Sequence, residues 1–252
     1  MMRKYLMGLT VGLLLPLAGQ AQTADEIIAK NIQARGGMNK LKAIQTLRVT
    51  GKMTQGPGLE APFSLELKRP NNGRMEFTFQ GLTAAQAYDG KNGWQIMPFG
   101  GRKDPQPLSP EDLKAAEEQA DMDGPLVDYK TKGHRVELVG KEKVEGTDAY
   151  KLKVTLKNGD VRYYYLDAEY FLDLKMEGKR NVRGTEREFE SSFGDYKEVG
   201  GVMFPHSIES GMKGNPEREK MVIDKIEVNA PIDDSRFKMP EVKKEETPKP
   251  NN

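Results

Sequence analysis

Residues that commonly perform catalysis or bind metal ions are scarce in this sequence. The chain has no cysteine, which excludes a nucleophilic thiol, a thiolate metal site and a disulfide framework. Its two histidines, His134 and His206, lie far apart and show neither the H-x-H nor the H-E-x-x-H spacing of a zinc site. Ser191 and Ser192 fall in an alternating strand pattern and not in a G-x-S-x-G turn. We therefore predict a protein that is not an enzyme, with no catalytic residues, no metal site and no cofactor.

Two charged motifs also have simpler structural interpretations. Residues 121–124 (DMDG) resemble the start of a calcium loop but lack the glycine and final glutamate of an EF-hand, so we predict a helix end and a turn. Arg180, Arg183 and Arg187 cluster around one predicted turn. Three acidic residues alternate with them: Glu186, Glu188 and Glu190. This alternation favours a solvated strand face over an anion site.

The N-terminus has the pattern of a cleavable secretory signal over residues 1–21. Arg3 and Lys4 precede an apolar stretch over 6–17, and Gly19-Gln20-Ala21 supplies the small residues of a cleavage site. The stretch is shorter than the roughly 20 apolar residues of a membrane span, although an uncleaved anchor stays the alternative. Because no cysteine follows the signal, the mature chain cannot be a lipoprotein.

The charge balance argues against nucleic acid as a partner. Removal of Arg3 and Lys4 leaves 37 basic against 38 acidic residues, a net charge of −1. The two signs are interspersed along the chain, whereas nucleic-acid-binding domains concentrate positive charge.

Hydrophobic periodicity predicts a mainly β fold with few helices, in the α+β class. Thr23 and Glu26 form a capping box that starts a helix over 24–35, and Ser109 with Pro110 starts another over 110–121. From Thr46 onward apolar residues recur every second position, which is typical of antiparallel strands. We predict ten or eleven strands in one strongly curved sheet, a single domain over 22–240, and a disordered tail over 241–252.

One face of this sheet is rich in methionine and aromatic residues. We predict that they line a cavity for acyl chains: Met53, Phe63, Leu65, Leu67, Met75, Phe77, Phe79, Tyr88, Trp94 and Ile96. An ordinary core is the alternative, but the predicted helices are small and acidic for such a long sheet. Trp94 alternates in phase with Ile96, so we expect it to face the apolar interior near the cavity.

The chain resembles the periplasmic outer-membrane lipoprotein-sorting proteins, the lipoprotein carrier LolA-like superfamily. The resemblance covers about 23–240 and depends on the order of several segments. They are Gly36-Gly37 after the first helix, LKAIQTLRVTGKM, AYDGKNGW, GDYKEVGGVMFPHSIE at 194–209 and KIEVNAPIDDSRFKMP at 225–240.

This resemblance implies an incomplete antiparallel β-barrel in which helices form a lid or plug over an apolar cavity. It further implies a soluble periplasmic monomer that carries lipid or lipoprotein acyl chains between inner- and outer-membrane delivery partners. The family's lid-locking arginine matches no single position here. Related members act as sensors, so a sensor or interaction module with a plugged cavity stays the alternative.

Overall fold

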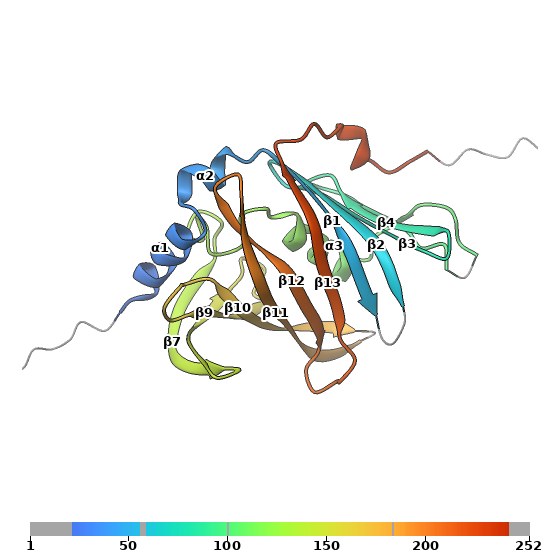
Figure 1. Cartoon of the computed structure of the whole chain (residues 1–252). Helices are drawn as coiled ribbons and strands as arrows, with labels where there is room; N and C mark the ends of the chain where they lie inside the picture. The colour runs from blue at the N-terminus through green and yellow to red at the C-terminus, as the bar shows by residue number, and fades with distance from the viewer. Residues whose placement is uncertain (1–21, 56–58, 100, 183, 242–252) are drawn as a thin grey trace, which may run out of the picture.

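The structure is a computed structural model that describes residues 22–55, 59–99, 101–182 and 184–241. The predicted signal peptide, residues 1–21, lies outside the described residues, as does the predicted tail beyond residue 241. The described chain forms one strongly curved sheet that bends around its helices (Figure 1).

Over the described residues the sheet has thirteen strands in the order β6-β5-β4-β3-β2-β1-β13-β12-β11-β10-β9-β8-β7, and the paired strands are antiparallel. Within these ranges it does not close into a barrel. The predicted curved antiparallel sheet is therefore confirmed, with more strands than the ten or eleven expected. The strands are β1 Thr46–Gln55, β2 Glu60–Lys68, β3 Asn72–Phe79, β4 Leu82–Tyr88, β5 Gly93–Ile96, β6 Gln106–Pro107, β7 Arg135–Val144, β8 Thr147–Thr155, β9 Val161–Asp167, β10 Asp173–Val182, β11 Thr185–Val199, β12 Val202–Met212 and β13 Glu219–Val228.

In the described part of the chain three α-helices accompany the sheet, and the two longer ones begin where the sequence predicts. Helix α1 (Ala24–Ala34) has the Thr23–Glu26 capping box, and α3 (Pro110–Ala120) has Ser109 as its N-cap. Helix α2 (Met38–Ala43) is a short turn of helix after α1, and a 3-10 turn covers Asp234–Arg236. None of the helices in the described part of the chain reaches the length and apolar character that a membrane span requires.

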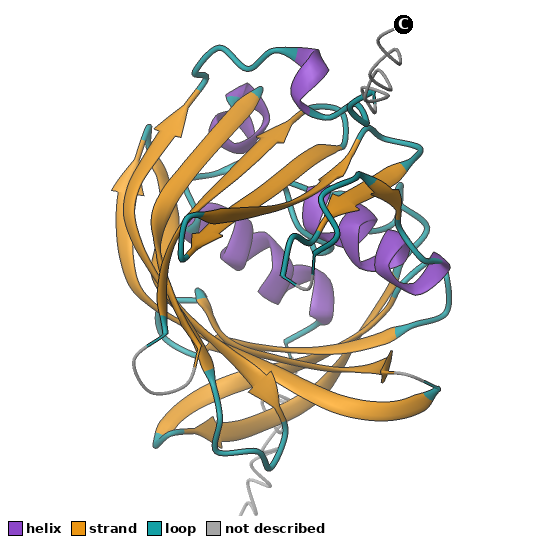
Figure 2. Ribbon diagram, turned by 90° about the vertical axis from the view of Figure 1, so that its right-hand side faces the viewer, coloured by secondary structure: helices purple, strands orange, loops and turns teal. Residues whose placement is uncertain are grey.

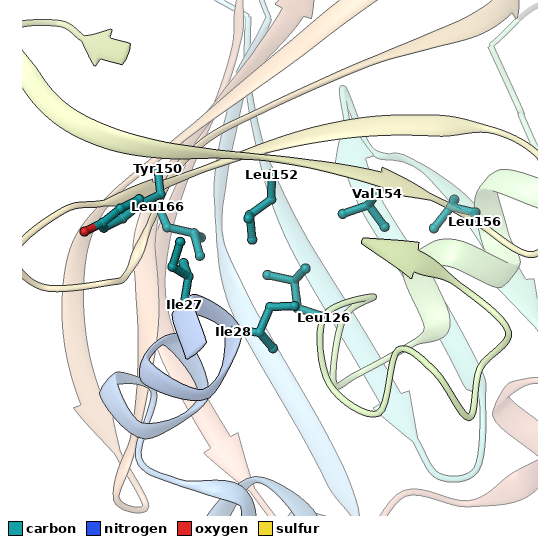
Figure 3. Close-up of a cluster of buried hydrophobic side chains, with 8 residues drawn as sticks. All are labelled: Ile27, Ile28, Leu126, Tyr150, Leu152, Val154, Leu156 and Leu166. Atoms are coloured by element: carbon teal, nitrogen blue, oxygen red, sulfur yellow. The ribbon is translucent and has the colours of Figure 1, made fainter. Parts of the chain in front are cut away.

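Helices lie inside the curve of the sheet and cover part of its concave face (Figure 2). Under α1, inward side chains of β8 and β9 are completely buried, and Leu152, Val154 and Leu166 have no exposed surface. Figure 3 shows Leu152 directed toward Ile28 of α1 and toward Leu126, which belongs to the segment after α3. This half of the concave face is therefore an ordinary packed core.

Asp123 fastens the segment after α3 to the rest of the fold. Its buried carboxylate accepts hydrogen bonds from Arg69 at 2.6 and 2.8 Å and from Lys42 at 2.6 Å. Burial opposes ionisation, but the hydrogen bonds from Arg69 and Lys42 outweigh it and lower the pKa of Asp123 from 3.8 to about 2. The predicted helix end and turn over 121–124 is confirmed, with Asp121 as the C-cap of α3.

The C-terminal segment 230–238, here called the strap, crosses the convex face of the sheet. Arg236 forms ion pairs with Glu66 at 2.8 Å and with Glu76 at 3.1 Å. Trp94 donates its indole N–H to the carbonyl of Phe237 at 2.8 Å. The strap therefore buries polar and aromatic side chains of the outer face of β2, β3 and β5.

Candidate functional site

Strands β2 and β3 direct one set of apolar side chains to the concave face. Phe63 is paired with Phe77, and Leu65 is paired with Met75, so these side chains share one face of the sheet. Gly73, which continues the same row, lies so close to α3 that an added Cβ would sit 3.1 Å from the Cβ of Ala120. The face that carries this row is therefore the one that the helices cover.

The same face continues across β1, β13, β12 and β11. Met53 is paired with Met221, Met221 with Ile208, and Ile208 with Phe193. Met53, Met221 and Ile208 pack against the same cluster as Phe63 and Leu67. Phe193, Ile208 and Met221 were not singled out from the sequence, although the alternation of β11 to β13 carries that signal.

Several of these inward side chains stay partly exposed. We call them the open wall: Met53, Leu65, Met75, Phe77, Phe79, Phe193, Ile208 and Met221. They lie on the concave side and keep exposed surface, whereas Leu152 and Val154 beside α1 have none. Phe77 stacks on Phe99, which is itself exposed, at a ring separation of 5.7 Å. The helices thus fill one part of the concave face and leave an apolar surface on another.

Other predicted residues of the concave face belong to its packed part. Phe63 and Leu67 are buried, with 4% and 6% of their surface exposed. Tyr88 is buried against Ala116 and Ala120 of α3. Phe63 and Leu67 pack in the core beside the open wall, and Tyr88 packs against α3. These three side chains are therefore less accessible to a ligand than the open wall.

Trp94 and Ile96 lie on the opposite face of the sheet. Trp94 is paired with Ala87, and Ala87 with Arg74, whose guanidinium lies 5.0 Å from the indole ring. The prediction that Trp94 faces the concave interior is therefore wrong, although the side chain is buried, with 2% exposed. Period-two alternation places Trp94 and Ile96 on a common face but cannot decide which face that is.

Arg162 bridges two separated parts of the concave face. It projects from β9 and binds Glu118 of α3 through two hydrogen bonds, of 3.1 and 2.9 Å. The guanidinium is almost completely buried, which strengthens a two-pronged ion pair of this kind. Helix α3 is thereby fastened to β9 by charge as well as to β3 and β4 by apolar packing. Sequence reasoning found no position for such an arginine.

Both histidines make contacts with the backbone. His206 is buried and its Nδ1 lies 3.1 Å from the carbonyl oxygen of Phe204. His134 Nδ1 accepts the backbone N–H of Lys157 at 3.1 Å. Within the ranges that the structure describes, no three His, Cys, Asp or Glu residues form a group that could hold a metal ion.

A polar hollow of about 200 Å³ lies between convex side chains of β9 to β11 and the β7–β8 hairpin. Lys175 inside it binds Glu177 at 2.9 Å and Glu190 at 2.6 Å, and Tyr165 donates to Glu177 at 2.8 Å. Arg218 also binds Glu190, and Lys213 lies 3.5 Å from Glu177, so the two carboxylates and these three cations form an ion-pair network on the convex face.

Known proteins resemble this chain in structure, whereas comparisons of the sequence found no match. No protein-family model matches the sequence, and no curated protein is significantly similar to it. A LolA superfamily protein from Nitrosomonas europaea is similar in structure, with a TM-score of 0.58 and 17% identity over 86% of this chain and 98% of that one. A DUF1329 family protein from Desulfovibrio piger has a TM-score of 0.59 and 12% identity, over 85% and 96% of the two chains.

A third similar structure is a putative outer membrane lipoprotein-sorting protein domain from Vibrio parahaemolyticus. Its TM-score is 0.55 and its identity 13%, over 83% of this chain and 94% of that one. All three alignments span most of both chains, so the likeness concerns the whole curved sheet with its helices. The chain therefore has a LolA-like fold.

Proposed function

We propose that the chain is a non-enzymatic periplasmic carrier that binds acyl chains of lipoproteins or other lipids on its open wall, for transfer towards the outer membrane. One observation supports this most: the open wall is apolar, faces the concavity and is still partly exposed. Soluble proteins seldom leave a contiguous apolar surface uncovered unless something binds there.

The chemistry of the open wall suits a flexible apolar ligand. Met53, Met75 and Met221 supply unbranched side chains that adapt to chains of different shape. Burial of apolar surface contributes about 25 cal/mol per Å², reduced by the cost of ordering the ligand. Delivery partners at the inner and outer membranes would load and unload a monomeric carrier of this kind.

Displacement of a bound fluorescent probe by palmitate tests the proposal. N-phenyl-1-naphthylamine is neutral and apolar, so it should bind the wild-type chain saturably and be displaced by micromolar palmitate. In Phe77→Asp a carboxylate replaces an aromatic ring in the open wall, and we expect affinity for both to fall at least about tenfold because an acyl chain cannot solvate the charge.

Thr78→Asp is the matched control. Thr78 is the next residue of β3 and projects to the opposite face, where its hydroxyl lies 2.9 Å from that of Thr83. We expect this variant to bind palmitate like the wild type. Wild-type affinity in a folded Phe77→Asp protein would disprove the assignment of the open wall.

The ion pair between Arg162 and Glu118 favours an alternative to the carrier function. A helix fastened by a buried ion pair on the concave face suits a sensor or interaction module whose cavity stays plugged. Mass spectrometry of material extracted from the purified chain separates the two. A carrier should retain stoichiometric lipid, whereas a plugged module should retain none and should fail to bind palmitate.

A further inference from the structure

Two arginines face each other on the concave side near the β10–β11 hairpin. Arg180 of β10 is paired with Arg187 of β11, and both side chains are exposed. They lie on the same face as Phe189, which is two residues from Arg187 and opposite Gly178. Like charges directly opposite each other on a sheet are destabilising, so the pair needs an explanation.

The convex residues beside them are paired with opposite charges. Lys179 binds Glu186 at 2.8 Å, and Lys213 lies 3.5 Å from Glu188. Within the part of the chain that the structure describes, neither Arg180 nor Arg187 forms an ion pair. Alternation thus places the glutamates of β11 on the convex face and leaves both arginines on the concave face, without an ion-pair partner among the described residues.

An aromatic ring holds one of these arginines in place. The guanidinium of Arg180 lies 5.5 Å from the ring centroid of Phe189, and that of Arg162 lies 5.4 Å from it. Arg162 is buried and its charge is balanced by Glu118. Arg180 is exposed, so it keeps its hydrogen-bond donors available while Phe189 orients it.

Glu219 is the acidic side chain that shares this face. It is paired with Ser210, whose hydroxyl lies 2.8 Å from that of the buried Ser191. Burial raises the pKa of Glu219, and nearby Arg180 opposes the shift. Since burial disfavours its charged form and it forms no ion pair with Arg180 within the described ranges, Glu219 is a weak counter-charge for the arginines.

The face changes from charged to apolar along β11. Arg187, Phe189, Ser191 and Phe193 follow at alternate positions, and Phe193 belongs to the open wall. The six residue steps from Arg187 to Phe193 along the strand span roughly 20 Å. An amphiphile with a long acyl chain has the same order, a charged end followed by an apolar chain, and a comparable length.

We propose that Arg180 and Arg187 bind the anionic head group, a carboxylate or phosphate, of an amphiphile whose acyl chain lies on the open wall. The inference rests on the proposed function and adds the head-group chemistry. Arginine suits the role because its planar guanidinium donates paired hydrogen bonds to either anion.

The test compares ligands of one chain length with different head groups. The assay measures how well palmitate, hexadecyl phosphate and hexadecanol displace N-phenyl-1-naphthylamine, a neutral probe that the arginines do not hold by charge. In Arg180→Gln/Arg187→Gln we expect the two anionic ligands to bind about tenfold more weakly and hexadecanol to change less than about twofold. Lys179→Gln/Lys213→Gln removes the same charge from the convex side and should leave all three affinities unchanged.

The remaining outcomes would overturn the proposal, and they distinguish failure of the head-group site from failure of the proposed function. If the arginine variant binds palmitate and hexadecyl phosphate like the wild type, the head-group assignment is wrong and the open wall stands. Displacement of the probe by inorganic phosphate alone would identify a free-anion site instead. If no ligand displaces the probe from the wild type, the inference and the proposed function fail together.

Discussion

Replacement of Asp123 by asparagine should produce a large, pH-dependent loss of stability. The side chain is only 5% exposed and accepts three charged hydrogen bonds, two from Arg69 and one from Lys42. Asparagine removes the negative charge and leaves Arg69 half-buried beside the carbonyls of Leu41 and Ile44. Loss of one partner from a buried ion pair costs about 3–5 kcal/mol, and we expect the lower end because Lys42 reaches solvent.

The pKa of Asp123 gives an independent magnitude and the sign of the pH dependence. A pKa lowered from 3.8 to about 2 corresponds to about 2 kcal/mol of stability. Since the folded-state pKa is the lower one, this contribution is complete above the unfolded value of 3.8 and is lost as the pH falls towards 2. The difference between wild type and variant should therefore be largest near neutral pH and shrink in acid.

Urea unfolding monitored by circular dichroism measures this difference at several pH values. Asp128→Asn is the control, because Asp128 also binds Lys42, at 2.8 Å, but is 43% exposed. An exposed pair contributes at most about 1 kcal/mol, so this variant should stay close to the wild type. An Asp123→Asn protein as stable as the wild type near neutral pH, or a difference that persists unchanged in acid, would show that the ionised Asp123 carboxylate does not stabilise the fold.

Two further predictions follow from residues outside the open wall. Because Trp94 lies under the strap and bonds to Phe237, its fluorescence should be blue-shifted and should stay unchanged when palmitate is added; a saturable change would contradict its placement. Gly36 has a φ of +119°, and an added Cβ would lie 2.2 Å from the carbonyl oxygen of Gly201. Gly36→Ala should therefore cost about 2 kcal/mol or more in urea unfolding, and more than Gly37→Ala, which shares a positive φ without the clash. Equal effects of the two alanines would show that the contact with Gly201 is unimportant.

Hairpin chemistry explains why the sequence predicts much of the sheet. Short turns over residues 69–71 and at Asn158-Gly159 join strands with regular alternation, so the two strands on either side of each turn are neighbours in the sheet. Phe63, Leu65, Met75 and Phe77 could be placed on a common face because their pairing follows from such a turn. The open wall also needs partners from β11 to β13, and that pairing depends on contacts distant in the sequence.

The misplacement of Trp94 has a specific physical cause. A turn from Asp89 to Asn92 pairs Tyr88 with Gly93, so Trp94 falls opposite Ala87 and not on the face of Tyr88. A pairing of β4 with β5 shifted by one residue would place Trp94 on the face of Tyr88. The strap that covers the indole comes from the far end of the chain, which local patterns could not indicate.

The arginine pair shows a second limit of local patterns. Arginines and glutamates that alternate along β11 suggest mutual neutralisation, and the sequence favoured a solvated face on that ground. In the strand, alternate residues project to opposite sides, so the two signs are separated across the sheet. The pairing of Arg180 with Arg187 became visible only from the register of β10 and β11, and Arg183 lies outside the described residues.

Methyl NMR of methionine-labelled protein can detect acyl-chain binding on the concave face, because methionines lie both inside and outside the open wall. On addition of palmitate we expect saturable shifts of the Met53, Met75 and Met221 methyl resonances. Met203, which projects to the convex face, and Met239, which is 44% exposed beyond the strap, should not shift. Unchanged signals from all three open-wall methionines, or shifts confined to Met203 and Met239, would contradict acyl-chain binding on the concave face.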